Sequence, residues 1–233
     1  MQFTKSIKMI AFDADDTLWM NQLFYDEFEA AFTELLSQYF AKDEVSARLL
    51  ATENRNVKIF GYGAKSFMLS MIETAVTLSH GTIPPQNIQQ IIDLGKAMLT
   101  RPIQLLDGVQ SVLESLETKY PLMVLTKGDL MDQQSKLARS GLGRFFQHVE
   151  VVSDKKPATY RHILHRYGLQ PDQFVMIGNS LRSDILPVLD INAHAIHIPY
   201  QFTWAHEQVA ESELNGKQFL QLDSIHQVVD CFV

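Results

Sequence analysis

Short apolar runs recur along the chain, and each ends at a loop of polar residues. The runs are Met9–Phe12, Leu122–Leu125, Val149–Val152 and Phe174–Ile177, followed by Ala193–Ile198, where Ala and Ile alternate with His. Apolar runs of this length, bounded by turn-forming residues, are typical of buried strands. From residue 109 onward, stretches with helical spacing of apolar residues lie between the runs. This alternation predicts an α/β fold with a doubly wound parallel sheet.

The helices of this region have recognisable ends. The predicted helices contain Val109–Leu116, Leu130–Ala138, Tyr160–Tyr167 and Ile185–Leu189. Gly141 and Gly168 follow the second and third of these stretches, where glycine commonly ends a helix. Pro187 lies near the start of the fourth, where proline is tolerated in the first helical turn.

Residues 21–100 differ from the rest because they contain no clear strand pattern. Apolar residues recur there at helical spacing in three stripes, which are Phe24, Phe28, Phe32, Leu35 and Tyr39, then Phe67, Met71, Ile72, Ala75 and Leu78, then Ile88, Ile91, Ile92 and Met98. The pattern predicts an all-helical domain over 21–100, inserted into an α/β core formed by 1–20 and 101–233. As a unit, such an insertion is also a candidate lid that excludes water from a site.

Composition excludes several classes of protein. The chain has 233 residues and a formal net charge of −7, with no cluster of Lys and Arg, which argues against nucleic acid as a partner. The single cysteine, Cys231, has no partner for an internal disulfide, so a cytoplasmic location is expected. The first ten residues lack a stretch typical of a signal peptide, and no run is long enough to span a membrane.

Four of the predicted strand ends carry chemically reactive side chains. The loops are Asp13-Ala14-Asp15-Asp16-Thr17, Thr126-Lys127-Gly128-Asp129, Ser153-Asp154-Lys155-Lys156-Pro157 and Gly178-Asn179-Ser180-Leu181-Arg182-Ser183-Asp184. The carboxyl ends of parallel strands meet at one edge of a sheet, so these loops should converge. Two close carboxylates repel each other unless a cation or a proton intervenes, which favours Mg²⁺ or acid–base chemistry. With the lysine and hydroxyl, the set suits phosphoryl transfer.

Structural roles compete with functional ones at several of these positions. Alone, Asp13 and Asp15 are as typical of a turn or a helix cap as of a site, and the other three loops favour the site. Asp129 and Asp184 also suit helix caps, and His162 with His165 suits a solvated helix face. Trp204-Ala205-His206-Glu207 begins like a zinc-protease signature but has alanine at position 210, which excludes that interpretation.

The four loops together resemble the motifs of the haloacid dehalogenase superfamily, in particular its aspartate-dependent phosphatases. Asp13, Asp15 and Thr17 match Asp-x-Asp-x-Thr, Thr126 matches the second motif, Lys155 or Lys156 the third, and Gly178 with Asp184 the fourth. The resemblance covers the sheet portions of the chain, about 150 residues. The insertion at 21–100 looks like the family's helical cap. Asn179 departs from the pattern, because the family usually has Asp there.

The resemblance implies a role for each matched residue. Asp13 would be the nucleophile, and Asp15 the general acid and then the base. Thr126, Lys127, Gly128 and Lys155 would hold the phosphate, with Lys155 preferred to Lys156. Mg²⁺ would be held by Asp13, the backbone carbonyl of Asp15, Asn179 and Asp184. An amide at position 179 carries no charge, so weaker metal binding is expected than with Asp.

The predicted function is a Mg²⁺-dependent phosphatase that hydrolyses a small phosphomonoester through an aspartyl-phosphate. Alternatives are a dehalogenase or phosphomutase of the same fold, or a weakly active binding or regulatory member, which Asn179 favours. Asp15 favours the phosphatase over the dehalogenase, since only ester hydrolysis benefits from a proton donor to the leaving group. The expected partner is a small phosphorylated metabolite, without nucleic acid or membrane, and a homo-oligomer is compatible with the sequence.

Overall fold

The chain divides by internal contacts into two units. The computed structural model describes residues 6–201, 207 and 209–232. An α/β unit contains Met1–Gln22, Ile103–Lys127 and Gln134–Val233, and a helical unit contains Leu23–Pro102 with Gly128–Gln133. The sequence-based division at 20/21 and 100/101 therefore compares with contact boundaries at 22/23 and 102/103, and the segment Gly128–Gln133 joins the helical unit.

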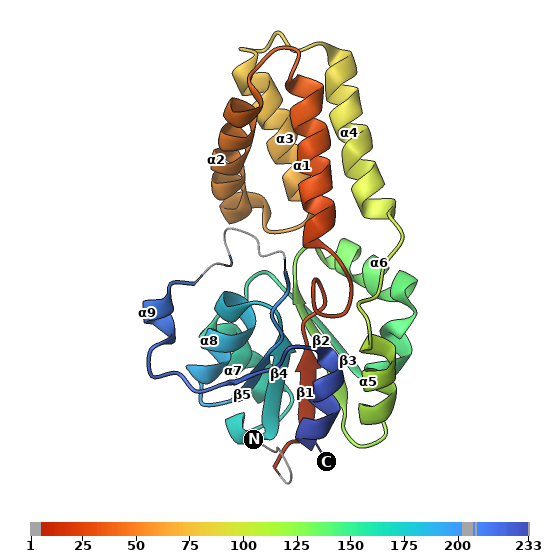
Figure 1. Cartoon of the computed structure of the whole chain (residues 1–233), viewed down its shortest axis with the longest axis vertical. Coiled ribbons are helices and arrows are strands. Elements are labelled where there is room, and N and C mark those ends of the chain that lie inside the picture. Colours follow the sequence, from red (N-terminus) through yellow and green to blue (C-terminus); the bar gives the residue numbers. More distant parts are fainter. Residues whose placement is uncertain (1–5, 202–206, 208, 233) are drawn as a thin grey trace. The chain divides into compact units, whose positions relative to one another are not determined.

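The α/β unit is built on a parallel sheet, as the apolar runs predict (Figure 1). The strands are β1 (Met9–Phe12), β2 (Leu122–Lys127), β3 (His148–Val152), β4 (Phe174–Gly178), β5 (His194–His197) and β6 (Leu220–Gln221). Their order is β3-β2-β1-β4-β5-β6, and every neighbouring pair is parallel. This arrangement confirms the doubly wound fold and places the end of β1 between those of β2 and β4, where the strand order reverses.

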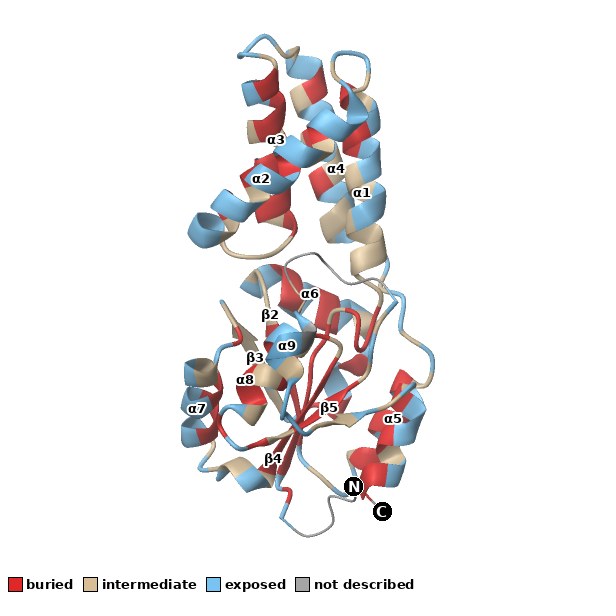
Figure 2. Cartoon of the chain, turned by 60° about the vertical axis from the view of Figure 1, so that its left-hand side comes forward, coloured by how far each residue is buried: buried red, intermediate tan, exposed pale blue. Residues whose placement is uncertain are grey.

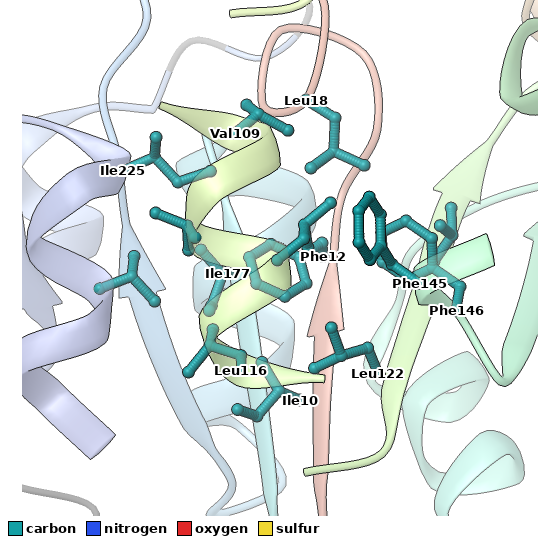
Figure 3. Close-up of a cluster of buried hydrophobic side chains, with 14 of the residues drawn as sticks. Ile10, Phe12, Leu18, Val109, Leu116, Leu122, Phe145, Phe146, Ile177 and Ile225 are labelled. Carbon is teal, nitrogen blue, oxygen red and sulfur yellow. The ribbon is translucent and has the colours of Figure 1, made fainter. Parts of the chain in front are cut away.

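Helices cover both faces of this sheet. The helical elements are α5 (Val109–Leu116), α6 (Leu130–Ser140), α7 (Pro157–Arg166), a π-helical turn (Leu181–Ile185), α8 (Leu186–Leu189), α9 (Glu211–Leu214) and 3₁₀ helices at Leu142–Phe145, Pro171–Gln173 and Ile225–Phe232. Alternate residues of a strand point to opposite faces. Ile10 and Phe12 accordingly pack with α5 and the last 3₁₀ helix (Figure 3), while Met9 and Ala11 pack with α7 and α8. Burial on both faces explains why β1, β2 and β4 are nearly continuous apolar runs, whereas none of the residues of β3 is buried.

The helical unit contains α1 (Gln22–Leu36), α2 (Lys42–Phe60), α3 (Ala64–Leu78) and α4 (Pro85–Thr100). Its core includes Phe32, Leu49, Met71 and Ile91, and the buried residues lie on the inward sides of the helices (Figure 2). No apolar stripe marks α2 in the sequence, because two of its four buried positions are Thr52 and Asn56. Among the described residues, no helix is both long and apolar enough to cross a membrane.

Candidate active site

Asp13 lies at the carboxyl end of the central strand β1. Its backbone N–H donates to the Ile177 carbonyl at 2.9 Å, so the end of β4 fixes its position. The side chain is 7% exposed, and its Oδ1 lies 2.5 Å from Lys155 Nζ. Burial raises the pKa of the Asp13 carboxyl to about 7, because desolvation outweighs the attraction of Lys155. Above that pH, Asp13 is an anion held against a single cation.

Lys155 connects two buried carboxylates. Its Nζ donates to Asp13 Oδ1 and, at 2.6 Å, to Asp184 Oδ1. Burial alone would lower the pKa of Lys155, but the two carboxylates outweigh it and raise the pKa above its ordinary value, so the ammonium form persists. The neighbouring Lys156 is exposed and pairs with Asp154 at 2.7 Å. Of the two lysines left open by the sequence, the structure therefore brings Lys155 to Asp13.

Asp15 is held by two side chains that the motif does not contain. The Trp19 indole donates from Nε1 to Asp15 Oδ1 at 2.7 Å. Lys136, on α6, donates to both oxygens of Asp15 at 3.0 and 3.2 Å and to Asn21 Oδ1 at 2.8 Å. Lys136 is 8% exposed, so this is a largely desolvated ion pair. The Asp15 carboxylate consequently has a defined position beside Asp13.

The third carboxylate of the loop, Asp16, caps a helix. Its backbone has φ 61°, a left-handed conformation that Asp adopts more readily than most residues. Its side-chain oxygens accept from the N–H groups of Asn21 and Gln22 at 2.8 to 3.0 Å, where α1 begins. Burial raises the pKa of Asp16 to about 7. The run of three acidic positions therefore contains one capping residue and two candidates for chemistry.

The second loop begins at the end of β2. Thr126 is 2% exposed and lies two residues beyond Val124, the partner of Phe12 in the register of β1 and β2. Lys127 donates to Ser183 Oγ at 2.9 Å and forms an ion pair with Glu207. Gly128 has φ 144°, a region that L side chains rarely adopt. Thr126 and Lys127 are thus the last two residues of β2, the strand next to β1, and not the first residues of a loop after Leu125 as the sequence predicted.

The fourth loop is fitted tightly around Asp184. A Cβ on Gly178 would lie 2.3 Å from Asp184 Oδ2, so only glycine fits there. Asp184 Oδ2 accepts from the Ser180 N–H at 3.0 Å, and Oδ1 accepts from Lys155. Ser180 provides the helix cap, since its hydroxyl accepts from the Ser183 N–H at 3.0 Å. Both Asp184 oxygens are therefore engaged with donors of the loop and of Lys155.

The side-chain amide of Asn179 lies among oxygen atoms that could hold a metal ion. One terminal atom of its amide lies 3.3 Å from Asp13 Oδ2, from the Asp15 carbonyl oxygen and from Thr17 Oγ1. As nitrogen, this atom donates to all three, and as oxygen, it faces two acceptors, an arrangement that a cation or a proton on Asp13 would stabilise. Asp13, Asp15 and Asn179 thus offer three hard oxygens at one point, the ligand type that Mg²⁺ prefers. Among the described residues, no group of three His, Cys, Asp or Glu could hold a metal.

Sequence reasoning missed the residues that support this set. Lys136, Ser183 and Glu207 enter through contacts between residues 121, 56 and 80 positions apart, which no local pattern carries. His197, on β5, is another, since its Nε2 lies 3.0 Å from the Asn179 carbonyl. One signal was available for Lys136: the inward face of α6 carries charged and amide residues where apolar ones are usual.

Comparison with known proteins places the chain in a family. Residues 7–188 match the model of the haloacid dehalogenase-like hydrolases. The chain belongs to this family, which confirms the resemblance drawn from the four loops and makes it a hydrolase.

Its relatives include named phosphatases. The glyceraldehyde 3-phosphate phosphatase of Methanothermobacter thermautotrophicus is 28% identical over 234 residues, covering 95% of this chain and 98% of that protein. The mouse (Mus musculus) N-acylneuraminate-9-phosphatase is 28% identical over 97 residues, 40% of this chain and 39% of that protein. A crystal structure of a haloacid dehalogenase-like hydrolase from Xanthomonas campestris has a TM-score of 0.86 and 39% identity, covering 97% and 90% of the two chains. The predicted enzyme class, a phosphoric monoester hydrolase, agrees with the activities named for both curated relatives.

Proposed function

We propose that the chain is a Mg²⁺-dependent phosphatase that hydrolyses a small phosphomonoester through an aspartyl-phosphate at Asp13. The observation that carries the proposal is the buried Asp13–Lys155 pair with Asp15 two residues away. A buried carboxylate held by a lysine is a candidate nucleophile, and a second carboxylate fixed beside it is a candidate proton carrier. The phosphatase relatives support ester hydrolysis as the reaction.

The two steps follow from these positions. A carboxylate oxygen of Asp13 attacks phosphorus, and the bond from phosphorus to the ester oxygen breaks as Asp15, which enters this step in its acid form after taking a proton from solvent, gives that oxygen its proton. Asp15, now a carboxylate, takes a proton from water as the water oxygen attacks phosphorus. The bond to Asp13 breaks, inorganic phosphate leaves, and both carboxyl groups return to their starting state. Lys155 holds Asp13 and balances phosphate charge, while Thr126 donates to a phosphate oxygen.

Asp13 Oδ2, the Asp15 carbonyl and the Asn179 amide oxygen are the groups that would hold Mg²⁺ in this proposal. When bound, the ion would neutralise charge on the phosphate oxygens. Asp184 remains a predicted fourth ligand, although its oxygens accept from Lys155 and Ser180 in the structure. In this ligand set, position 179 is where an amide takes the place of the carboxylate that the family usually has.

A hydrolysis assay with generic phosphomonoesters, with and without Mg²⁺, tests the proposal. The chain should release inorganic phosphate, and Asp13→Asn should lower the rate at least about a thousandfold, since an amide is a poor nucleophile. Lys156→Met is the matched control, because Lys156 is exposed and pairs with Asp154, two residues before it in the chain. Phosphate release that survives Asp13→Asn would refute the nucleophile. Halide release from haloacids, in place of phosphate release, would favour the dehalogenase alternative.

A further inference from the structure

The carboxylate of Glu207 lies in a set of donors at the same edge of the sheet. Its Oε1 forms an ion pair with Lys127, and its Oε2 accepts from the hydroxyls of Ser180 and Ser183, the latter at 2.8 Å. Its side chain is 12% exposed. Burial would raise the pKa of Glu207, but Lys127 and the two hydroxyls outweigh burial and hold it below its ordinary value. These three donors together form a receptor for one carboxylate.

The hydroxyl hydrogens of this receptor are aimed in advance. A serine hydroxyl has one hydrogen to donate. Ser180 Oγ already accepts from the Ser183 N–H at 3.0 Å, and Ser183 Oγ accepts from Lys127 Nζ at 2.9 Å. Each hydroxyl is thereby left to donate its hydrogen toward the anion. Without an anion, the two hydroxyl hydrogens would have no carboxylate to receive them and the Lys127 charge would lose this counter-ion, which is costly in a desolvated site.

The receptor lies beside the reaction centre. Lys127 is the last residue of β2, and Ser180 and Ser183 follow β4, while β1, which Asp13 follows, lies between these strands. The hydrogen bond from Lys127 to Ser183 therefore joins the loops on either side of the nucleophile. Ser180 is also the residue next to Asn179, whose amide lies 3.3 Å from Asp13 Oδ2. A small substrate with its phosphorus at Asp13 has this receptor within reach of its other end.

We propose that Lys127, Ser180 and Ser183 form a subsite for a second anionic group of the substrate, a carboxylate, and that Glu207 occupies it in the free chain. The inference rests on the proposed function and narrows its substrate to short phosphomonoesters that carry a carboxylate. The shape supports a carboxylate, because one already makes the full set of contacts with both of its oxygens. Substrate binding would exchange one carboxylate for another, without leaving the donors unpaired.

Two esters that differ only at the far end test the subsite. 2-Phosphoglycolate has a carboxylate where ethyl phosphate has a methyl group. The ratio of their kcat/KM values should exceed one in the parent chain and should fall at least about tenfold in Lys127→Met, as expected for loss of a charged hydrogen bond. Lys156→Met should leave the ratio unchanged. An equal loss for both esters in Lys127→Met would overturn the subsite, since Lys127 would then serve the phosphate alone.

Substitutions of Glu207 test the internal occupant. Glu207→Gln keeps the side-chain shape and removes the charge that neutralises Lys127, so the ratio should rise about tenfold. Glu207→Ala should act in the same direction, and the two variants together separate competition from loss of folding. If the ratio is unchanged or lower in Glu207→Gln while the melting temperature falls, Glu207 is a permanent structural contact and the exchange is wrong.

Binding without turnover separates this inference from the proposed function. In the Asp13→Asn background, calorimetric titration should show tighter binding of 2-phosphoglycolate than of ethyl phosphate, and Lys127→Met should abolish the difference. Discrimination in binding without hydrolysis by the parent chain would refute the phosphatase and keep the subsite. Hydrolysis of both esters at equal efficiency, with equal binding, would refute the subsite and keep the phosphatase.

Discussion

The α/β unit and residues 23–102, the main segment of the helical unit, bury polar groups of different kinds. The α/β unit buries Asp13, Lys136, Lys155 and Asp184, all charged and all in direct ion pairs or hydrogen bonds at one edge of its sheet. Between residues 23 and 102, every one of which is described, the buried polar side chains are uncharged: Thr33, Thr52, Asn56, Ser66, Ser70, Thr74 and Asn87.

This difference distinguishes the α/β unit, which contains the candidate active site, from the helical unit. Burying a charge costs far more than burying a hydroxyl, because a hydroxyl can donate to a carbonyl of its own helix. Ser70 and Thr52 do so, donating to the Ser66 and Arg48 carbonyls at 2.9 and 3.0 Å. These two hydroxyls of the helical unit are thus satisfied within their own helices. The α/β unit instead gathers charges from three loops and from α6, at a cost in stability that is expected of a site for chemistry.

The largest expected loss of stability comes from removing Lys155, the cation that Asp13 and Asp184 share. Lys155→Met leaves two buried carboxylates, Asp13 and Asp184, facing each other without a counter-ion. We expect a loss of about 3–5 kcal/mol in the free energy of unfolding and no measurable hydrolysis. Urea denaturation followed by circular dichroism gives the first value. Lys156→Met, with its exposed side chain, should change neither, and a similar loss in that control would mean that the burial of Lys155 is not the cause.

A polar truncation in the helical unit should cost less. The Asn56 amide donates to Ser70 Oγ at 3.1 Å and to Glu73 Oε2 at 2.8 Å, joining α2 to α3. Asn56→Ala should lower the free energy of unfolding by about 2 kcal/mol through the lost hydrogen bonds and the unpaired partners. Chemical denaturation measures the change. A loss as large as that of Lys155→Met would contradict the distinction between the two units.

A smaller change in stability is expected when the Asn179 amide near Asp13 is replaced by a carboxylate. Asn179→Asp adds a negative charge beside Asp13 Oδ2, so without metal the melting temperature should fall. Added Mg²⁺ should raise it again, and the Mg²⁺ concentration for half-maximal stabilisation should be about tenfold lower than in the parent chain. Thermal unfolding over a Mg²⁺ series measures both. Equal Mg²⁺ dependence in the two chains would exclude Asn179 as a ligand.

The smallest expected effect concerns the one strongly shifted acid of the helical unit. Burial and the nearby Glu29 raise the pKa of Glu53 from 4.5 to about 7. The folded chain therefore binds more protons than the unfolded chain between these values, so the free energy of unfolding should fall as pH rises from 4.5 to 7. Asp13 and Asp16 contribute to the same slope, so Glu53→Gln should reduce it without removing it, and should stabilise the chain by about 1 kcal/mol above pH 7. Thermal unfolding at pH 5 and pH 8 tests it, and an unchanged slope would contradict the assignment.

The sequence could predict those features that depend on residues adjacent in the chain. The strands and the residues just beyond them, Asp13, Thr126 and Lys155, are predictable because an apolar run and its polar end are adjacent in the chain. The two-residue strand β6 is too short to show a period. The sequence did not predict α2 as a separate helix, because Thr52 and Asn56 interrupt its apolar stripe. It gave no role to Lys136 or Glu207, because these residues act through contacts with Asp15 and Lys127 that form only in the folded chain.

The position of the Trp19 indole makes it a fluorescent reporter on the candidate active site. It is 1% exposed and donates to Asp15 at 2.7 Å, so a natural fluorophore touches the residue proposed to carry protons. Indole emission responds to the charge and hydrogen bonding around the ring. With the other tryptophan, Trp204, replaced by phenylalanine, the emission of the chain becomes an optical record of what happens at Asp15, readable in a stopped-flow instrument without any label.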